Sequence, residues 1–124
     1  MTLLLDTHAF LWWRLDDRRL KPAARDAIAT AAVVFVSAAS GWEVAIKQAL
    51  GRLTLKESFR DMVESSGFRE LPVTLAHAGG LSDLPDHHGD PFDRMLVVQA
   101  HLERATLVTH DRSFESYDIR VMWT

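Results

Sequence analysis

The stretch DPFDRMLVVQAHLERATLVTHD, residues 90–111, indicates the fold because it joins a helical pattern directly to a buried strand. Asp90 followed by Pro91 is typical of a helix start, with the aspartate as N-cap and the proline in the first helical position. The apolar residues that follow recur at helical spacing. The run at 105–111 is short, and its apolar residues lie at its start, at 105, 107 and 108, as expected for a short buried strand. A helix that leads into such a strand is typical of an α/β domain.

The same alternation of apolar runs and amphipathic stretches extends along the whole chain. Strands are predicted over residues 2–6, 33–37, 68–73, 105–111 and 119–123. Helices are predicted over residues 9–15, 22–32, 38–50, 56–66, 74–84 and 90–100, with residues 85–89 as a loop. In the helix at 38–50 the apolar residues form a stripe at helical spacing. This order favours an α/β fold with a mainly parallel sheet.

The composition is that of an ordinary globular protein. Its 124 residues are 48% hydrophobic and 25% charged, which predicts a single domain over residues 1–124 with a real core. The formal net charge of -3 weakens a nucleic-acid interpretation without excluding a local basic patch. The absence of cysteine rules out disulfides and thiolate metal sites, and it fits a cytoplasmic location. Asp6 interrupts the apolar amino terminus before a signal-peptide core could form, and no apolar run is long enough to span a membrane.

Four acidic residues stand out by their positions. Asp6 and Asp111 each close a predicted buried strand, and open parallel sheets bind ligands outside the carboxyl ends of their strands. Asp93 lies within the apolar arc of its helix, where a carboxylate is costly unless it has a partner. Glu43 borders the apolar stripe of the helix at 38–50. We therefore expect these acids to gather at one edge of the sheet.

Such a gathering of acids has a chemical consequence. Carboxylates that converge in one cleft raise each other's pKa unless a cation neutralises them. Oxygen ligands without cysteine suit Mg²⁺ or Mn²⁺. Hydrolysis of phosphodiesters uses sites of this kind, often with two ions about 3.5–4 Å apart, one activating water and one stabilising the leaving oxygen. The acid pattern is therefore typical of metal-dependent phosphodiester hydrolysis.

Four segments carry a resemblance to a known family. They are LLLDTHAFLWW, VSAASGWEVAIK with the following LGRL, HHGDPFDRMLVVQA, and LVTHDRSFESY. In this order and at these spacings, the chain resembles the PIN-domain ribonucleases, in particular the VapC-type toxins of type II toxin–antitoxin pairs. The resemblance implies a three-layer α/β domain with a five-stranded, mainly parallel sheet, a divalent-metal site and endoribonuclease activity. It also implies an antitoxin partner and self-association as a homodimer.

The acids of that family correspond to four residues of this sequence. The resemblance assigns the catalytic metal ligands, in family order, to Asp6, to Glu43 in WEVAIK, to Asp93 in DPFDR and to Asp111 in THD. Because the set is complete, the resemblance favours an active enzyme that cleaves RNA. The alternative is a non-catalytic RNA- or protein-binding module that keeps the fold without the cleavage.

The same residues also have structural interpretations. Asp90 fits an N-cap better than a ligand, and Asp93 could complete a capping box at the third helical position. Glu43 and Lys47 are spaced to form an ion pair on a helix surface. The two strand-end aspartates could instead cap the turns after their strands. We favour the ligand role for Asp6, Glu43, Asp93 and Asp111, and Asp90 stays a secondary candidate.

Other polar residues near the predicted site carry less weight. Thr109 is the hydroxyl best placed to orient an acid or a water, ahead of Thr7 and Ser37. The spacing of the histidines matches no helical zinc motif, so we expect loop residues at His8, His87, His88 and His110. Candidate phosphate contacts are Arg14, Arg94 and Arg112, and candidate base-stacking residues are Trp12 and Trp13.

Overall fold

The strands form one sheet at the centre of the molecule. The computed structural model describes residues 1–87 and 89–124, so His88 of the predicted loop lies outside the described residues. The strands are β1 (Thr2–Leu5), β2 (Val33–Ser37), β3 (Arg69–Leu71), β4 (Thr106–Thr109) and β5 (Val121–Trp123). Neighbouring strands all pair in parallel, in the order β3-β2-β1-β4-β5. The predicted α/β fold with a parallel sheet is confirmed.

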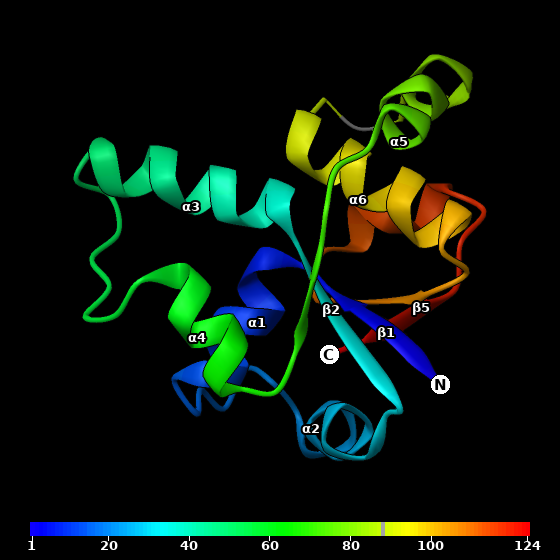
Figure 1. The fold of residues 1–124 in the computed structure, drawn as a ribbon. Coiled ribbons are helices and arrows are strands. Elements are labelled where there is room, and N and C mark those ends of the chain that lie inside the picture. Colours follow the sequence, from blue (N-terminus) through cyan, green and yellow to red (C-terminus); the bar gives the residue numbers. More distant parts are fainter. Residues whose placement is uncertain (88) are drawn as a thin grey trace.

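Helices connect the strands at the predicted places, with shifted ends. They are α1 (Thr7–Arg14), α2 (Pro22–Thr30), α3 (Ala38–Ala49), α4 (Phe59–Ser65), α5 (Leu75–Gly80) and α6 (Pro91–Leu102). Two short 3₁₀ segments complete the described elements, η1 (Leu81–Asp83) and η2 (Arg112–Ser116). In Figure 1, α3 extends away from the end of β2, and α5 and α6 lie together on the other side of the sheet from α4 and α2. Among the described residues, no helix combines the length and the apolar character that crossing a bilayer requires.

Local contacts decide where the helices begin and end. The hydroxyl of Ser58 accepts the backbone N–H of Asp61 at 3.1 Å, so α4 begins at Phe59 and not at residue 56, where the prediction had placed its start. The next predicted helix is interrupted after Gly80, where η1 takes over. A Cβ on Gly80 would lie only 2.7 Å from Cγ1 of Val98 in α6. Glycine at this position therefore allows α5 to pack closely on α6.

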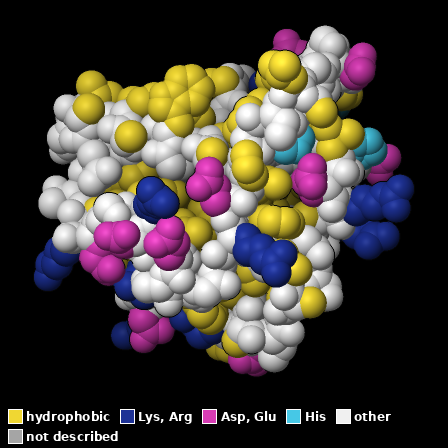
Figure 2. Space-filling view, viewed as in Figure 1, with side chains coloured by type: hydrophobic (Ala, Val, Ile, Leu, Met, Phe, Trp, Pro, Cys, Tyr) yellow, Lys and Arg dark blue, Asp and Glu magenta, His cyan; other side chains and the backbone are white. Residues whose placement is uncertain are grey.

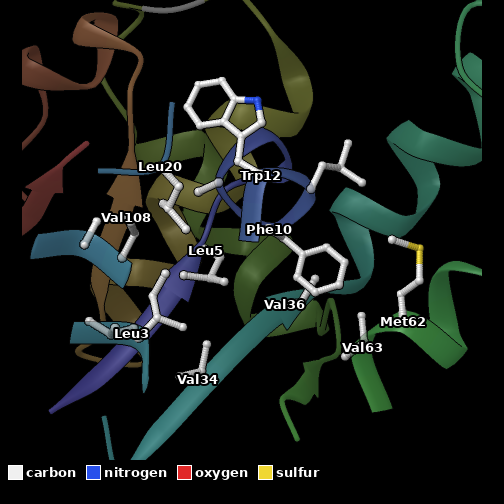
Figure 3. Packing of buried hydrophobic residues seen from close by; sticks show 14 residues of the cluster. Leu3, Leu5, Phe10, Trp12, Leu20, Val34, Val36, Met62, Val63 and Val108 are labelled. Atoms are coloured by element: carbon white, nitrogen blue, oxygen red, sulfur yellow. The ribbon is translucent and has the colours of Figure 1, made fainter. Parts of the chain in front are cut away.

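Two hydrophobic clusters cover the two faces of the sheet. Leu3 and Leu5 face the cluster beneath α1, α2 and α4, which includes Phe10 and Trp12 (Figure 3). Leu4 faces the opposite cluster, to which α6 contributes Leu96, Val97 and Ala100. The split follows from the alternation of side chains along a strand. The sheet between these clusters is the middle of the three predicted layers.

The apolar stripe of α3 lies on the surface. Trp42 is 66% exposed, Leu50 is 60% exposed and Ile46 is 38% exposed. Figure 2 shows hydrophobic side chains along the edge of the molecule that α3 forms. Because α3 projects from the end of the sheet, only its other side, with Ala39 and Val44, is buried. Helical spacing therefore predicts the helix but not the uncovered position of its stripe.

Candidate active site

Two strand ends and two helices meet at one edge of the sheet. Because β1 and β4 are parallel neighbours, the residues that follow them lie at the same edge. The helices α3 and α6 contact each other through Trp42 and Phe92, whose rings meet edge to face with centroids 5.2 Å apart. The predicted acids that follow the two strands or belong to the two helices are Asp6, Asp111, Glu43 and Asp93.

Asp6 is buried, and both of its carboxylate oxygens accept hydrogen bonds. As the N-cap of α1, it accepts the backbone N–H of Ala9 through Oδ1 at 2.7 Å. The hydroxyl of Thr109 donates to Oδ2 at 2.5 Å. Burial raises the pKa of Asp6 above its ordinary value, and these two hydrogen bonds and the nearby charge of His8 oppose that rise. Each carboxylate oxygen has a further lone pair, so capping α1 does not exclude binding a metal ion.

Glu43 is held in place by the start of α1. The hydroxyl of Thr7 donates to Oε1 of Glu43 at 2.6 Å and lies 2.9 Å from the hydroxyl of Ser40. Nζ of Lys47 lies 3.2 Å from Oε2, and the Glu43 side chain is only 13% exposed. The ion pair expected from the sequence is therefore part of a network that orients the carboxylate. Sequence analysis missed Ser40, although its three-residue spacing to Glu43 puts both on one helix face.

Asp93 is half-buried and surrounded by other acids. Asp90 is the N-cap of α6, accepting the backbone N–H groups of Phe92 and Asp93 through Oδ1 at 2.8 and 3.1 Å, as the sequence indicated. The pKa of the Asp93 carboxyl is raised to about 8, with burial as the largest cause. The other causes of this rise are the charges of Asp90, Glu43, Asp6 and Asp111, in decreasing order. The residues predicted to converge are thus close enough to repel one another.

Asp111 is exposed and begins η2. Its Oδ1 accepts the backbone N–H of Ser113 at 2.9 Å and the hydroxyl of Ser113 at 2.7 Å. Its own N–H donates to the hydroxyl oxygen of Thr109 at 3.0 Å. Thr109 is fully buried and so links the two strand-end acids, since its hydroxyl also donates to Asp6. Asp111 therefore caps a turn, as the structural alternative predicted, but it still lies beside the other acids.

The chemistry of these side chains fits a hard divalent cation. Carboxylate oxygens are the preferred ligands of Mg²⁺ and Mn²⁺, and a cation would relieve the repulsion that raises the pKa of Asp93. In the part of the chain that the structure describes, no three His, Asp or Glu side chains already surround one point as metal ligands do.

The histidines and arginines that the sequence singled out have contacts within the protein. His8 is helical, contrary to the expectation of a loop, because α1 begins at Thr7. It stacks on Trp12 with ring centroids 5.9 Å apart, and His110 meets the same ring edge to face at 5.4 Å. The further contacts join Arg14 to Glu57, Arg94 to Asp86, Arg112 to Trp123 and His87 to Tyr117. No described histidine belongs to a group that could hold a metal ion.

Comparisons with known proteins agree with this geometry. The family model described as PIN domain matches residues 3–120. The chain is 34% identical over 124 residues to Ribonuclease VapC22 of Mycobacterium tuberculosis, an alignment that covers 94% of this chain and 92% of the relative.

Solved structures show the same fold at lower sequence identity. The crystal structure of VapBC2 from Rickettsia felis, bound to a DNA fragment from its promoter, has a chain with a TM-score of 0.72 and 13% identity, covering 98% of both chains. A toxin–antitoxin complex from Klebsiella pneumoniae contains a chain that matches with a TM-score of 0.68 and 19% identity, covering 97% of this chain and 95% of the other. From the family model and the curated relative together, this chain belongs to the PIN-domain family, in its VapC-type group.

Proposed function

We propose that this VapC-type protein is a Mg²⁺- or Mn²⁺-dependent endoribonuclease and the toxin of a toxin–antitoxin pair. The observation that carries the proposal is the environment of Asp93, whose pKa is raised to about 8. Burial is the largest cause, and the charges of four neighbouring carboxylates add to it, those of Asp90, Glu43, Asp6 and Asp111. A fold that holds so many like charges together is destabilised unless a cation binds them. The 34% identity to a ribonuclease over nearly the whole chain supports the same activity. We further propose that residues 1–124 act as one nuclease domain.

In this proposal the chain supplies acids that are oriented before RNA arrives. The metal ligands are Asp6, Glu43, Asp93 and Asp111. A bound divalent cation supplies a water that is nucleophilic at neutral pH and neutralises charge on the phosphodiester. Thr109 donates to Asp6 and Thr7 donates to Glu43, which orients both carboxylates. Asp93 holds its proton in the metal-free protein and releases it when the charge around it is neutralised.

Cleavage by purified protein tests this function. We expect single-stranded RNA to be cut in the presence of Mg²⁺ or Mn²⁺ and to stay intact in EDTA. Asp93→Asn should abolish the cleavage, whereas Asp26→Asn, which changes an exposed acid on α2, should leave it unchanged. Cleavage in EDTA, or full activity of Asp93→Asn, would reject the metal-dependent mechanism. RNA binding without cleavage under every condition would favour the non-catalytic module.

We propose that the antitoxin inhibits by placing a basic segment against the acids. Without metal, four neighbouring carboxylates give this edge of the sheet a negative potential that favours a cationic partner. Expression of the protein alone should halt growth, and Asp6→Asn should be tolerated at equal soluble abundance. A structure of the complex with the antitoxin remote from Asp6 and Asp93 would contradict this mode of inhibition. Equal growth arrest by the wild type and Asp6→Asn would point to a non-catalytic toxin.

We propose that the apolar stripe of α3 contributes to a homodimer interface. Exposed hydrophobic patches of this kind mark interaction surfaces, and this one includes Trp42 and Leu50. Light scattering after gel filtration should show a dimer for the wild type and a folded monomer for Trp42→Ser. The matched control is Leu75→Ser, since Leu75 is 91% exposed on α5, away from the stripe. A dimer that persists in Trp42→Ser would place the interface elsewhere.

A further inference from the structure

A small pocket opens between α1 and α3, beside the acids. It has a volume of about 300 Å³, and we call it the α1–α3 pocket. Its polar and charged lining consists of Thr7, His8, Arg19, Lys47 and Arg52. Leucine, valine and tryptophan side chains complete the lining. Among the described residues, none of those that line the pocket is acidic, although the acid cluster lies next to it and the chain has a net charge of -3.

The pocket adjoins the candidate active site, because two of its lining residues, Thr7 and Lys47, contact Glu43. Thr7 lines the pocket and at the same time donates its hydroxyl proton to Glu43 at 2.6 Å. Lys47 lies one helical turn beyond Glu43, about 6 Å further along the axis of α3, and contacts it at 3.2 Å. A strand bound at the acids would therefore pass close to the α1–α3 pocket.

Arg52 brings a second cation to the same place. The chain turns back after α3 at Gly51, which has a positive φ of 72° that favours glycine. The turn is closed by the backbone N–H of Arg52, which donates to the carbonyl of Lys47 at 2.9 Å. Within residues 1–87 and 89–124, the guanidinium of Arg52 has no acidic partner, whereas Lys47 is paired with Glu43. Arg52 is therefore the lining cation that is available to an anion from outside the chain.

Trp12 forms a rigid floor for the other basic groups. It is buried, which removes it as a base-stacking residue, and it lies in the hydrophobic core. His8 stacks on its ring at 5.9 Å, and the guanidinium of Arg19 lies over it at 4.9 Å. Stacking on Trp12 holds both side chains in position before a ligand arrives, so less conformational entropy is lost on binding. Because Arg19 is also paired with Asp17 at 2.7 Å, Arg52 remains the lining cation without an acidic partner among the described residues.

We propose that the α1–α3 pocket binds a phosphate of the RNA strand next to the bond that is cleaved. This inference rests on the proposed function, because it takes the acid cluster as the place of cleavage. The strand needs cations near that cluster, since its phosphates are repelled by the carboxylates. The arginines first considered for this task are less suitable: Arg14, for example, is tied to Glu57 by two hydrogen bonds at 3.0 and 3.1 Å. Arg52 is then the positioning residue for the substrate.

The salt dependence of RNA binding tests this assignment. Fluorescence anisotropy of a short labelled single-stranded RNA is measured at several salt concentrations, with Asp93→Asn as the background so that the RNA stays intact. Adding Arg52→Gln should weaken binding several-fold and lower the slope of log K against log salt by about 0.7, the loss of one phosphate contact on a single strand. Arg52→Lys should retain the slope. Arg120→Gln should also retain it, because Arg120 is an exposed arginine before β5, at the opposite edge of the sheet.

Cleavage kinetics separate this inference from the proposed function. In the active protein, Arg52→Gln should raise KM for RNA while kcat and the thermal melt stay unchanged. An unchanged slope and KM for Arg52→Gln would overturn the phosphate assignment even if the wild type cleaves RNA. The assignment is equally overturned if Arg52→Gln weakens only the binding of an antitoxin, which would make the pocket a protein contact. If no variant or wild type cleaves RNA, the proposed function fails, and the binding slopes still decide whether the pocket holds a phosphate.

Discussion

Asp93→Asn should change how stability depends on pH. In the metal-free folded protein the pKa of Asp93 is about 8, against 3.8 for an ordinary aspartate. A group whose pKa is raised by folding stabilises the fold fully below its unfolded value, and this contribution is lost as the pH rises through the folded value. The free energy of unfolding of the wild type should therefore fall between about pH 4 and about pH 8, where only the folded chain keeps the proton.

The size of this effect follows from one proton. The slope is about 1.4 kcal/mol per pH unit, so the wild type should lose about 3 kcal/mol between roughly pH 5.5 and pH 8. This is an upper value, since Asp93 is half-buried and solvent screens part of the repulsion. For a domain of this size it corresponds to at most about 12 °C in Tm. Asparagine keeps the shape without titrating, so the variant should lack this loss and melt no lower than the wild type at pH 8.

Thermal melts at both pH values, in EDTA and in excess Mn²⁺, measure the prediction. An ion that binds only the folded state stabilises it by about 2.7 kcal/mol at 100 times Kd, and Asp93→Asn should gain less than the wild type. Asp26→Asn on α2 should follow the wild type in all four conditions. The reasoning is refuted if Asp93→Asn keeps the wild-type pH dependence or the full stabilisation by Mn²⁺. A mere helix-capping role would instead lower the melting point of the metal-free variant and leave the metal shift intact.

Three further predictions concern single contacts. Thr109→Val should destabilise the fold by about 1–3 kcal/mol in urea unfolding, because a buried oxygen of Asp6 loses its hydrogen-bond donor. Thr109→Ser should restore most of the lost stability. An unchanged unfolding midpoint for the valine variant would argue against the hydrogen bond from Thr109 to Asp6. Gly80→Ala should lower the free energy of unfolding by about 1–3 kcal/mol, because the added methyl group overpacks the contact with Val98. The loss should be clearly smaller in a Val98→Ala background, where the close contact is removed. Equal losses in both backgrounds would contradict the packing argument. The carboxyl of Asp17 should titrate at about 2 by NMR, because the hydrogen bond from Arg19 favours its charged form. Titration at 3.8 would show that this contact is absent in solution.

The elements that hold the acids could be predicted because their signals are local. The buried runs of β1 and β4 indicate parallel strands, and strand ends in such a sheet share an edge, which places Asp6 and Asp111 together. Asp93 was conspicuous because a carboxylate in an apolar arc needs a partner. Helix ends were less accurate where a side-chain cap decided them, as Ser58 does for α4.

The contacts between elements could not be read from local patterns. The bond from Thr7 to Glu43 depends on how α1 packs against α3, which no periodicity encodes. The exposure of the apolar stripe of α3 could not be predicted for the same reason, since helical spacing identifies an apolar face but not what covers it. The α1–α3 pocket likewise needs the turn at Gly51 that returns Arg52 to Lys47. Long-range packing of this kind becomes visible only in three dimensions.

Sequencing of RNA ends after expression tests directly whether RNA cleavage depends on Asp93. Cells that produce the wild type are compared with cells that produce Asp93→Asn at equal soluble abundance, with no antitoxin present. We expect new RNA ends at defined positions with the wild type and none above background with the variant, because we propose that Asp93 is one of the acids that hold the catalytic metal ion. The same new ends with both proteins would show that cleavage does not depend on this acid, and the account of the site would be wrong.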